Sequence, residues 1–349
     1  MNSRERVLKV LDGQMPDRVP VMEIFIDPKV IDSICPGMSH EDFIDYAEVD
    51  CVTCLTMADS PENISWVDKE KKIFRDKWGA LQQLTEEVIP VQIEPARIQT
   101  ENDLKKYQPP DPAKSPVFGY VRKLVKRFKG KRAIAVVGEA AFAPAQYLRS
   151  GLANLMLDFV MNPAFAKKLL QIGVDYHIEL YKRLIKNEGV EIVVLGDDYA
   201  YKNGPFMSPQ HFEQFILPCL KTVVKAIKDA GGFVIKHTDG DIWKIVDMIV
   251  SSGVDMLGPL EPAYMQLDKV RSRFKNKVGV LGNIDIDLLS TGTTEQVKAA
   301  TIELIKRVSP SGGHIVSSGN SISSSVKGEN FMAMIKTVKE FGKYPISLK

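Results

Sequence analysis

The sequence predicts a (β/α)8 barrel. Three observations favour this fold class: short apolar runs alternate with amphipathic helical patterns, eight such runs occur, and none is followed by the G-x-G-x-x-G turn of a dinucleotide-binding sheet. Alternating strands and helices produce a parallel sheet, and eight parallel strands favour a closed barrel over an open sheet. The chain has 349 residues, of which 44% are apolar and 26% charged, so we expect a single domain over residues 1–349.

The predicted elements follow one another along the whole chain. The first twenty residues have a helical pattern and lack the apolar core of a signal peptide. Eight short apolar runs then predict the strands. In chain order, the predicted strands are 19–26, 49–55, 133–139, 191–195, 233–237, 254–257, 277–281 and 313–316.

Helical patterns follow most of these strands, for example at 209–230, 242–252, 294–308 and 328–341. Helix signals support these assignments: Ser208 is a good N-cap, and Pro209 occupies the first helical position. The gap between the second and third strands is irregular. Its segments 72–83 and 88–94 predict a β-hairpin excursion over the barrel, and the Pro-rich stretch 108–116 predicts a loop.

Composition excludes several classes of function. A net charge of +2 argues against nucleic acid as the main partner. No stretch approaches the roughly 20 apolar residues of a membrane span, so we expect a cytoplasmic protein. Cys51 and Cys54 fall in a strand-like run, where positions three apart face opposite ways, so they are not expected to hold a metal together.

Polar side chains gather where the predicted strands end. In barrels of this class the active site lies at the C-terminal ends of the strands. Acids stand at seven of the eight ends, and such a ring repels itself unless a cation, a proton or a basic ligand offsets it. In strand order these positions are Glu23 with Asp27, Met57 with Asp59, Glu139, Asp197 with Asp198, His237 with Asp239 and Asp241, Glu261, Asn283 with Asp285, and Ser317, Ser318 with Asn320.

The end of the fifth strand is the most informative of these positions. The apolar run from Phe233 ends in His237, Asp239 and Asp241, and Gly240 lets the backbone turn. Residues two apart on a strand point the same way, so His237 and Asp239 are placed to converge on one ligand or metal.

Several of these motifs together resemble the uroporphyrinogen decarboxylase superfamily. They cover nearly the whole chain, and their order and spacing carry the resemblance. They are Arg75-Asp-Lys-Trp78-Gly79, Gly196-Asp197-Asp198-Tyr199, His237-Thr-Asp239-Gly240-Asp241, Gly258-Pro-Leu-Glu261-Pro262, Gly282-Asn283-Ile-Asp285, and Gly319-Asn320 followed by Glu329-Asn330. The resemblance implies a (β/α)8 barrel and one of two chemistries, porphyrinogen decarboxylation or corrinoid-dependent methyl transfer.

The residues favour methyl transfer. Decarboxylases of the superfamily carry N-terminal arginines that bind substrate carboxylates, whereas the corresponding region here, 20–27, has no arginine and offers acids. In the thiol-methylating branch, zinc is bound by His-x-Cys and a distant Cys. Here His237 matches that histidine, Asp239 occupies the first cysteine position, and Asn320 falls near the second. A site of His237, Asp239 and Glu261 would be a harder Lewis acid, suited to an oxygen leaving group.

The resemblance therefore implies a methyltransferase that moves methyl from a small donor, most simply a methoxylated aromatic, to a corrinoid on a separate protein. Zinc is the expected metal, held by His237, Asp239 and Glu261, and a homodimer fits the family. We predict a catalytic role for His237, Asp197 and Glu139. The predicted substrate-binding residues are Met57, Phe142, Tyr199, Tyr201, Phe206 and Asn320.

Three alternatives remain at this point. One is a metal-free porphyrinogen decarboxylase. A second is a methyltransferase working in the opposite direction, from methylcobalamin to a thiol or a folate. The third is a barrel without activity that only binds a corrinoid protein.

Overall fold

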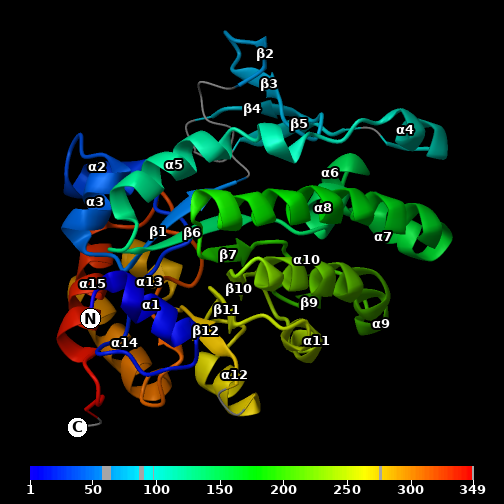
Figure 1. Ribbon diagram of the computed structural model, residues 1–349. Helices are drawn as coiled ribbons and strands as arrows, with labels where there is room; N and C mark the ends of the chain where they lie inside the picture. Colours follow the sequence, from blue (N-terminus) through cyan, green and yellow to red (C-terminus); the bar gives the residue numbers. More distant parts are fainter. Residues whose placement is uncertain (57–63, 86–89, 97, 275–276, 348–349) are drawn as a thin grey trace.

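The computed structural model describes residues 1–56, 64–85, 90–96, 98–274 and 277–347. Seven strands form one parallel sheet in the order β1-β6-β7-β10-β11-β12-β13. Their bounds are β1 (Cys51–Leu55), β6 (Ala133–Gly138), β7 (Ile192–Leu195), β10 (Phe233–Lys236), β11 (Met256–Leu257), β12 (Gly279–Leu281) and β13 (His314–Ile315). Each lies within a predicted strand, and the curled sheet with its surrounding helices confirms the barrel fold (Figure 1).

The segment predicted as the first strand closes the barrel between β1 and β13. Val21 forms a parallel bridge with Val316, and the backbone N–H of Asp50 donates to the Val21 carbonyl at 2.9 Å. A second parallel bridge joins Ile26 and Ile322. The predicted continuous strand over 19–26 is wrong in this respect, because pairing occurs only at isolated residues. Pro20 contributes to this interrupted pairing, since it has no N–H to donate to a neighbouring strand.

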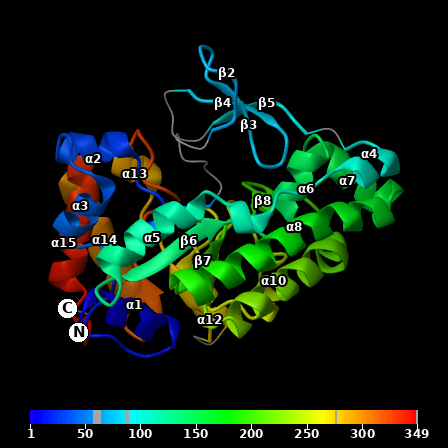
Figure 2. The ribbon, with the colours of Figure 1, turned by 45° about the horizontal axis from the view of Figure 1, so that its top comes forward.

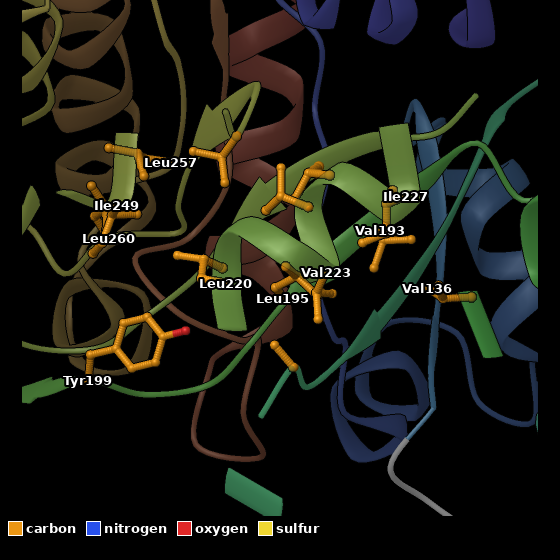
Figure 3. Packing of buried hydrophobic residues seen from close by; sticks show 14 of the residues in the cluster. Val136, Val193, Leu195, Tyr199, Leu220, Val223, Ile227, Ile249, Leu257 and Leu260 are labelled. Atoms are coloured by element: carbon orange, nitrogen blue, oxygen red, sulfur yellow. The ribbon is translucent and has the colours of Figure 1, made fainter. Parts of the chain in front are cut away.

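Two clusters of buried side chains hold the barrel together. The inner cluster fills the barrel with alternate strand residues such as Cys51, Val194 and Ile235, and helix α1 (Ser3–Leu11) adds Val7 and Val10 to it. Cys54 belongs instead to the outer cluster, between strands and helices, as the spacing of the two cysteines predicts. Figure 3 shows this outer layer, with Val193 and Leu195 of β7 beside Leu220, Val223 and Ile227 of α10 (Leu217–Asp229).

Helices surround the strands and bear out the predicted patterns at 294–308 and 328–341. The remaining elements are α2 (Pro28–Ile34), α3 (His40–Ala47), α4 (Glu101–Lys106), η2 (Pro112–Lys114), α5 (Val117–Phe128), α6 (Phe142–Leu148), α7 (Leu152–Met161), α8 (Pro163–Arg183), η3 (Leu184–Glu188), α9 (Pro209–His211), η4 (Phe212–Ile216), α11 (Val246–Ser251), α12 (Leu267–Arg273), α13 (Ile286–Thr291), α14 (Thr294–Val308) and α15 (Gly328–Phe341). None of the helices in the described residues is both long and apolar enough to cross a membrane.

The predicted helix 209–230 contains a π-helical turn, η4, between α9 and α10. Pro218 lies just after this turn and has no N–H for the carbonyl four residues earlier. The wider turn is the usual response of a helix to such an interruption.

The excursion after β1 is larger than the predicted hairpin. It is a four-stranded antiparallel sheet of β2 (Trp66–Asp68), β3 (Ile73–Arg75), β4 (Leu81–Gln83) and β5 (Val91–Glu94), and it stands off the barrel in both views (Figures 1 and 2). Strands of three or four residues with polar, exposed positions leave no clear period in the sequence. Trp78, with 2% of its surface exposed, anchors the excursion against Tyr176 of α8.

Candidate functional site

His237 follows the last residue of β10, and its ring has a fixed orientation. Its backbone N–H donates to the Leu195 carbonyl of β7 at 2.9 Å. Ring atom Nδ1 lies 2.8 Å from the carbonyl oxygen of Pro259. Because a carbonyl oxygen can only accept, Nδ1 carries the proton and donates it. In the neutral ring this leaves the lone pair on Nε2, which lies 3.6 Å from Oδ1 of Asp239.

Two carboxylates approach this imidazole. The ligand atoms of Asp198, His237 and Asp239 all lie within 4.8 Å of one another, and we call these residues the Asp198–His237–Asp239 cluster. Oδ1 of Asp198 accepts the backbone N–H of Asp239 at 3.0 Å. Asn320 donates from Nδ2 to Oδ1 of Asp239 at 2.8 Å. The cluster thus joins the ends of β7 and β10 to the loop that follows β13.

The charges of the cluster favour a cation. Burial raises the pKa of Asp239, and the neighbouring charges of Asp198 and Glu261 raise it further, while His237 and Asn320 act in the opposite direction. One imidazole nitrogen and two carboxylate oxygens form a ligand set that suits zinc, and three protein ligands leave a coordination position open for a substrate. The residues present therefore fit the metal that the sequence predicts.

Glu261 lies beside the cluster rather than in it. Its Oε2 accepts the backbone N–H of Gly240 at 2.6 Å. Among the described residues, Asp198 takes the place that the sequence assigned to Glu261 as the second carboxylate near His237. The sequence shows two adjacent acids, Asp197 and Asp198, at the end of the fourth predicted strand. It does not show which of the two faces the site.

Asp197, the other acid of that pair, turns toward helix α6. Its side chain is buried, and its two oxygens accept backbone N–H groups at the start of α6, among them those of Ala141 and Phe142, both at 2.9 Å. This is an N-terminal cap provided from a neighbouring strand. A catalytic role for Asp197 stays a prediction, and the contacts favour a structural role.

Glu139, at the end of β6, is suited to proton transfer. Burial raises the pKa of its carboxyl to about 7, against the lowering effect of the Lys77 charge. Tyr147 donates to Oε1 at 2.8 Å, and Oε2 has no hydrogen-bond partner among the described residues. A carboxyl group that titrates near neutrality can both give and take a proton at physiological pH. Glu139 as a catalytic residue stays a prediction that this environment supports.

The predicted aromatic residues divide into two pairs. Phe142 and Tyr199 are fully buried and pack edge to face, with ring centroids 5.9 Å apart. Tyr201 and Phe206 belong to the hairpin of β8 (Ala200–Tyr201) and β9 (Gly204–Pro205), and their rings stack at 5.7 Å. Tyr201 is 47% exposed and Phe206 is half-buried, so solvent reaches this second pair, and a substrate-binding role for it stays a prediction. Met57 and Asp59 lie outside the described residues.

A buried acid, Glu23, is linked to the cluster through Ser318 and Asn320. Glu23 is fully buried, and burial raises its pKa to about 8, although hydrogen bonds from Ser318 oppose the shift. The Ser318 hydroxyl lies 2.7 Å from Glu23 Oε2 and 3.2 Å from the carbonyl oxygen of Asn320. One hydroxyl proton cannot serve both acceptors. A protonated Glu23 resolves this, because it donates to Ser318 Oγ and frees that hydroxyl to donate to Asn320.

The variant Glu23→Gln should change how stability depends on pH. The folded pKa of about 8 exceeds the ordinary 4.5, so between these values the folded protein binds the extra proton, and its stability falls as pH rises. Glutamine reproduces the neutral donor pattern without titrating. We expect the stability of the variant relative to the unmodified protein to rise by about 3.5 kcal/mol between pH 5 and pH 8, most steeply, at about 1.4 kcal/mol per pH unit, in the middle of this range.

Urea unfolding at pH 5, 6.5 and 8 measures this difference. Glu213→Gln, at an exposed position on η4, is the matched control and should show no such trend. A difference between Glu23→Gln and the unmodified protein that stays constant with pH would show that Glu23 is ionised throughout.

Comparison with known proteins places the chain in a family. Residues 77–341 match the sequence pattern described as uroporphyrinogen decarboxylase (URO-D). The chain belongs to the uroporphyrinogen decarboxylase family. This confirms the resemblance seen in the sequence motifs, and the match includes Trp78, the cluster and the loop carrying Asn320.

Curated relatives in the family are distant. A uroporphyrinogen decarboxylase of Trichodesmium erythraeum is 27% identical over 254 residues, which are 70% of this chain and 68% of that protein. Another, from Crocosphaera subtropica, is 24% identical over 214 residues, covering 61% of this chain and 52% of its own. Among solved structures, a methyltransferase from Methanosarcina mazei superimposes with a TM-score of 0.76 at 17% identity, over 98% of this chain and 99% of the other. This likeness establishes a shared fold.

Proposed function

We propose that this member of the uroporphyrinogen decarboxylase family transfers a methyl group from a methoxylated aromatic donor to the cobalt of a corrinoid held by a separate protein. The Asp198–His237–Asp239 cluster is the observation that carries the proposal. It offers nitrogen and oxygen ligands, without cysteine, at the barrel end where this fold places its chemistry. Such ligands suit activation of an oxygen leaving group better than activation of a thiol.

The proposed reaction breaks the bond between the methyl carbon and the ether oxygen. The reduced cobalt provides the electron pair for the new bond to carbon, and the oxygen keeps the old pair as a phenolate. Zinc held by Asp198, His237 and Asp239 would supply Lewis acidity to that oxygen. Glu139, which follows β6, the strand next to β7, would then give the phenolate its proton, which its pKa of about 7 permits at neutral pH.

Other residues of the site position the reactants. Pro259 fixes the tautomer and direction of His237, and Asn320 holds the carboxylate of Asp239. The stacked Tyr201 and Phe206 rings provide an aromatic face for the ring of the donor. Holding donor and acceptor in line converts a collision of two molecules into a step within one complex.

The names of the curated relatives favour a second candidate, porphyrinogen decarboxylation. A porphyrinogen carries several carboxylates, and this barrel end presents Asp198, Asp239 and Glu261 to it. Repulsion between like charges opposes binding of such a substrate. The segment 20–27, where arginines would bind those carboxylates, contains no arginine.

Two parallel incubations, one with methoxybenzenes and one with uroporphyrinogen, separate the two candidates. Zinc-loaded protein is incubated without oxygen with free cob(I)alamin and a panel of methoxybenzenes, and the absorbance of cob(I)alamin is followed while phenols are measured by chromatography. We expect loss of cob(I)alamin and release of one phenol for each methyl transferred. Decarboxylation of uroporphyrinogen, with no methyl transfer from any methoxyarene, would replace the proposal with the second candidate.

A further inference from the structure

Lys236, the last residue of β10, is a lysine in the interior of the protein. Its side chain is fully buried, and it precedes His237 in the chain. Along the strand it shares a face with Val234, which belongs to the apolar layer between strands and helices. Among the described residues its ammonium forms no ion pair with a carboxylate. A buried charge without a paired acid is costly, so a specific compensating environment is required.

That environment consists of backbone carbonyls and one aromatic ring. The ammonium donates to the carbonyl oxygens of Leu195 at 3.1 Å and Asp197 at 2.6 Å, and also to that of His237. Its nitrogen lies 4.1 Å from the centroid of the Tyr199 ring, which adds a cation–π contact. Three donors meet three acceptors, so the lysine has no free hydrogen-bonding capacity. A role as a nucleophile or as a ligand for substrate is therefore excluded by its contacts.

The three carbonyls belong to the two strand ends that carry the cluster. The β7–β10 ladder ends with the pair Leu195 and Lys236, followed by one more backbone bond from His237 to Leu195. Beyond that point the segment with Asp197 and Asp198 leaves the ladder. There the sheet hydrogen bonds have ended, and the Lys236 ammonium connects the two backbones by donating to the carbonyls of both Asp197 and His237.

The ammonium also has an electrostatic effect on the site. Its charge attracts the nearby carboxylates of Asp197, Asp198 and Asp239. It therefore offsets part of the mutual repulsion between these acids, for which the sequence analysis names a cation, a proton or a basic ligand as the compensating group. Both effects, the geometric and the electrostatic, act on Asp198 and His237 together.

We propose that Lys236 is a positioning residue that sets the separation between Asp198 and His237 and so determines the metal affinity of the Asp198–His237–Asp239 cluster. This inference rests on the metal site of the proposed function. Lys236 acts through backbone atoms and touches neither metal nor substrate. Partners of this kind, one step removed from the ligands, commonly change metal affinity by about 10- to 100-fold.

The test compares zinc affinity across variants by competition with a chromophoric chelator, with circular dichroism to confirm folding. Lys236→Met keeps the length of the side chain and removes its donors, and we expect affinity about 10- to 100-fold weaker. Lys236→Gln keeps two N–H donors on a shorter chain and should give an intermediate affinity. Arg271→Met is the matched control, since Arg271 is a buried cation that donates to the carbonyl of Gly313 at the opposite end of the strands.

Each outcome decides the inference. Weaker binding in the Lys236 variants, with the affinity of Arg271→Met unchanged, supports it. A folded Lys236→Met that binds zinc as tightly as the unmodified protein overturns it and leaves the proposed function intact. If the unmodified protein binds no divalent metal, the metal site itself is contradicted, and the inference fails with it. If neither Lys236 variant folds, the lysine serves the fold as a whole, and the positioning role is rejected.

Discussion

The His237→Ala variant should lose zinc binding and slow methyl transfer by about 100- to 1000-fold. His237 provides the one nitrogen ligand of the cluster, and the bond from Nδ1 to the Pro259 carbonyl leaves the lone pair on Nε2, which lies 3.6 Å from Oδ1 of Asp239. Without the imidazole, two carboxylates remain close together, and their repulsion favours protonation over metal binding.

Two measurements follow the effect of His237→Ala. Chelator competition gives the zinc affinity, and the cob(I)alamin assay gives the transfer rate. His211→Ala is the control, because that imidazole packs against Phe159 and Phe215 and belongs to α9. If the folded His237→Ala protein binds zinc with unchanged affinity, His237 is not a metal ligand.

The Gly240→Ala variant should lower the free energy of unfolding by about 2–5 kcal/mol. Gly240 has a φ of +77°, which disfavours any residue with a Cβ, and a Cβ there would lie 2.5 Å from the carbonyl carbon and oxygen of Tyr201. Those atoms are backbone, so relief requires the β8–β9 hairpin to move away from the His237–Asp241 loop. The same movement would disturb the bond from Gly240 N–H to Glu261.

The control for this clash is Gly231→Ala. Gly231 has a φ of +94°, but a Cβ there would meet nothing within 4 Å. It therefore measures the backbone strain alone, about 1–2 kcal/mol. Equal losses of stability for the two variants in urea unfolding would show that the hairpin does not press on the loop.

The sequence predicted the barrel well because its strands are buried on both faces. Runs such as 133–137 and 192–195 are entirely apolar, which is typical of parallel strands covered by helices. The excursion was predicted poorly for the opposite reason. Its strands are short and largely exposed, so they carry little apolar periodicity, and their pairing depends on contacts such as Trp78 with Tyr176.

The candidate site was predicted in part. His237 and Asp239 were predicted from a spacing of two residues on a strand. The strand ends at Lys236, so the two lie close together in the following loop, where Asp198 and Asn320 bind Asp239. Asp198 and Asp197 are adjacent, and the choice between them depends on the start of α6, whose N–H groups bind Asp197. That contact joins residues more than fifty positions apart, so no local pattern reveals it.

Glu23 and Lys236 show a further limit of local patterns. Glu23 was recognised as an acid at a strand end, but its partner Ser318 lies 295 residues away. Lys236 interrupts a run of apolar residues, and a lysine in a strand buried on both faces is itself a signal for a specific role. Its carbonyl partners, however, become visible only when the two strand ends are placed side by side.

The central claim is that the Asp198–His237–Asp239 cluster holds a metal ion. A crystal structure of the zinc-loaded protein, with anomalous diffraction measured at the zinc edge, tests it most directly. We predict an anomalous peak about 2.0–2.2 Å from Nε2 of His237 and from one carboxylate oxygen each of Asp198 and Asp239. A protein that takes up no zinc, or a peak elsewhere that leaves Nε2 of His237 without a metal, would contradict the account.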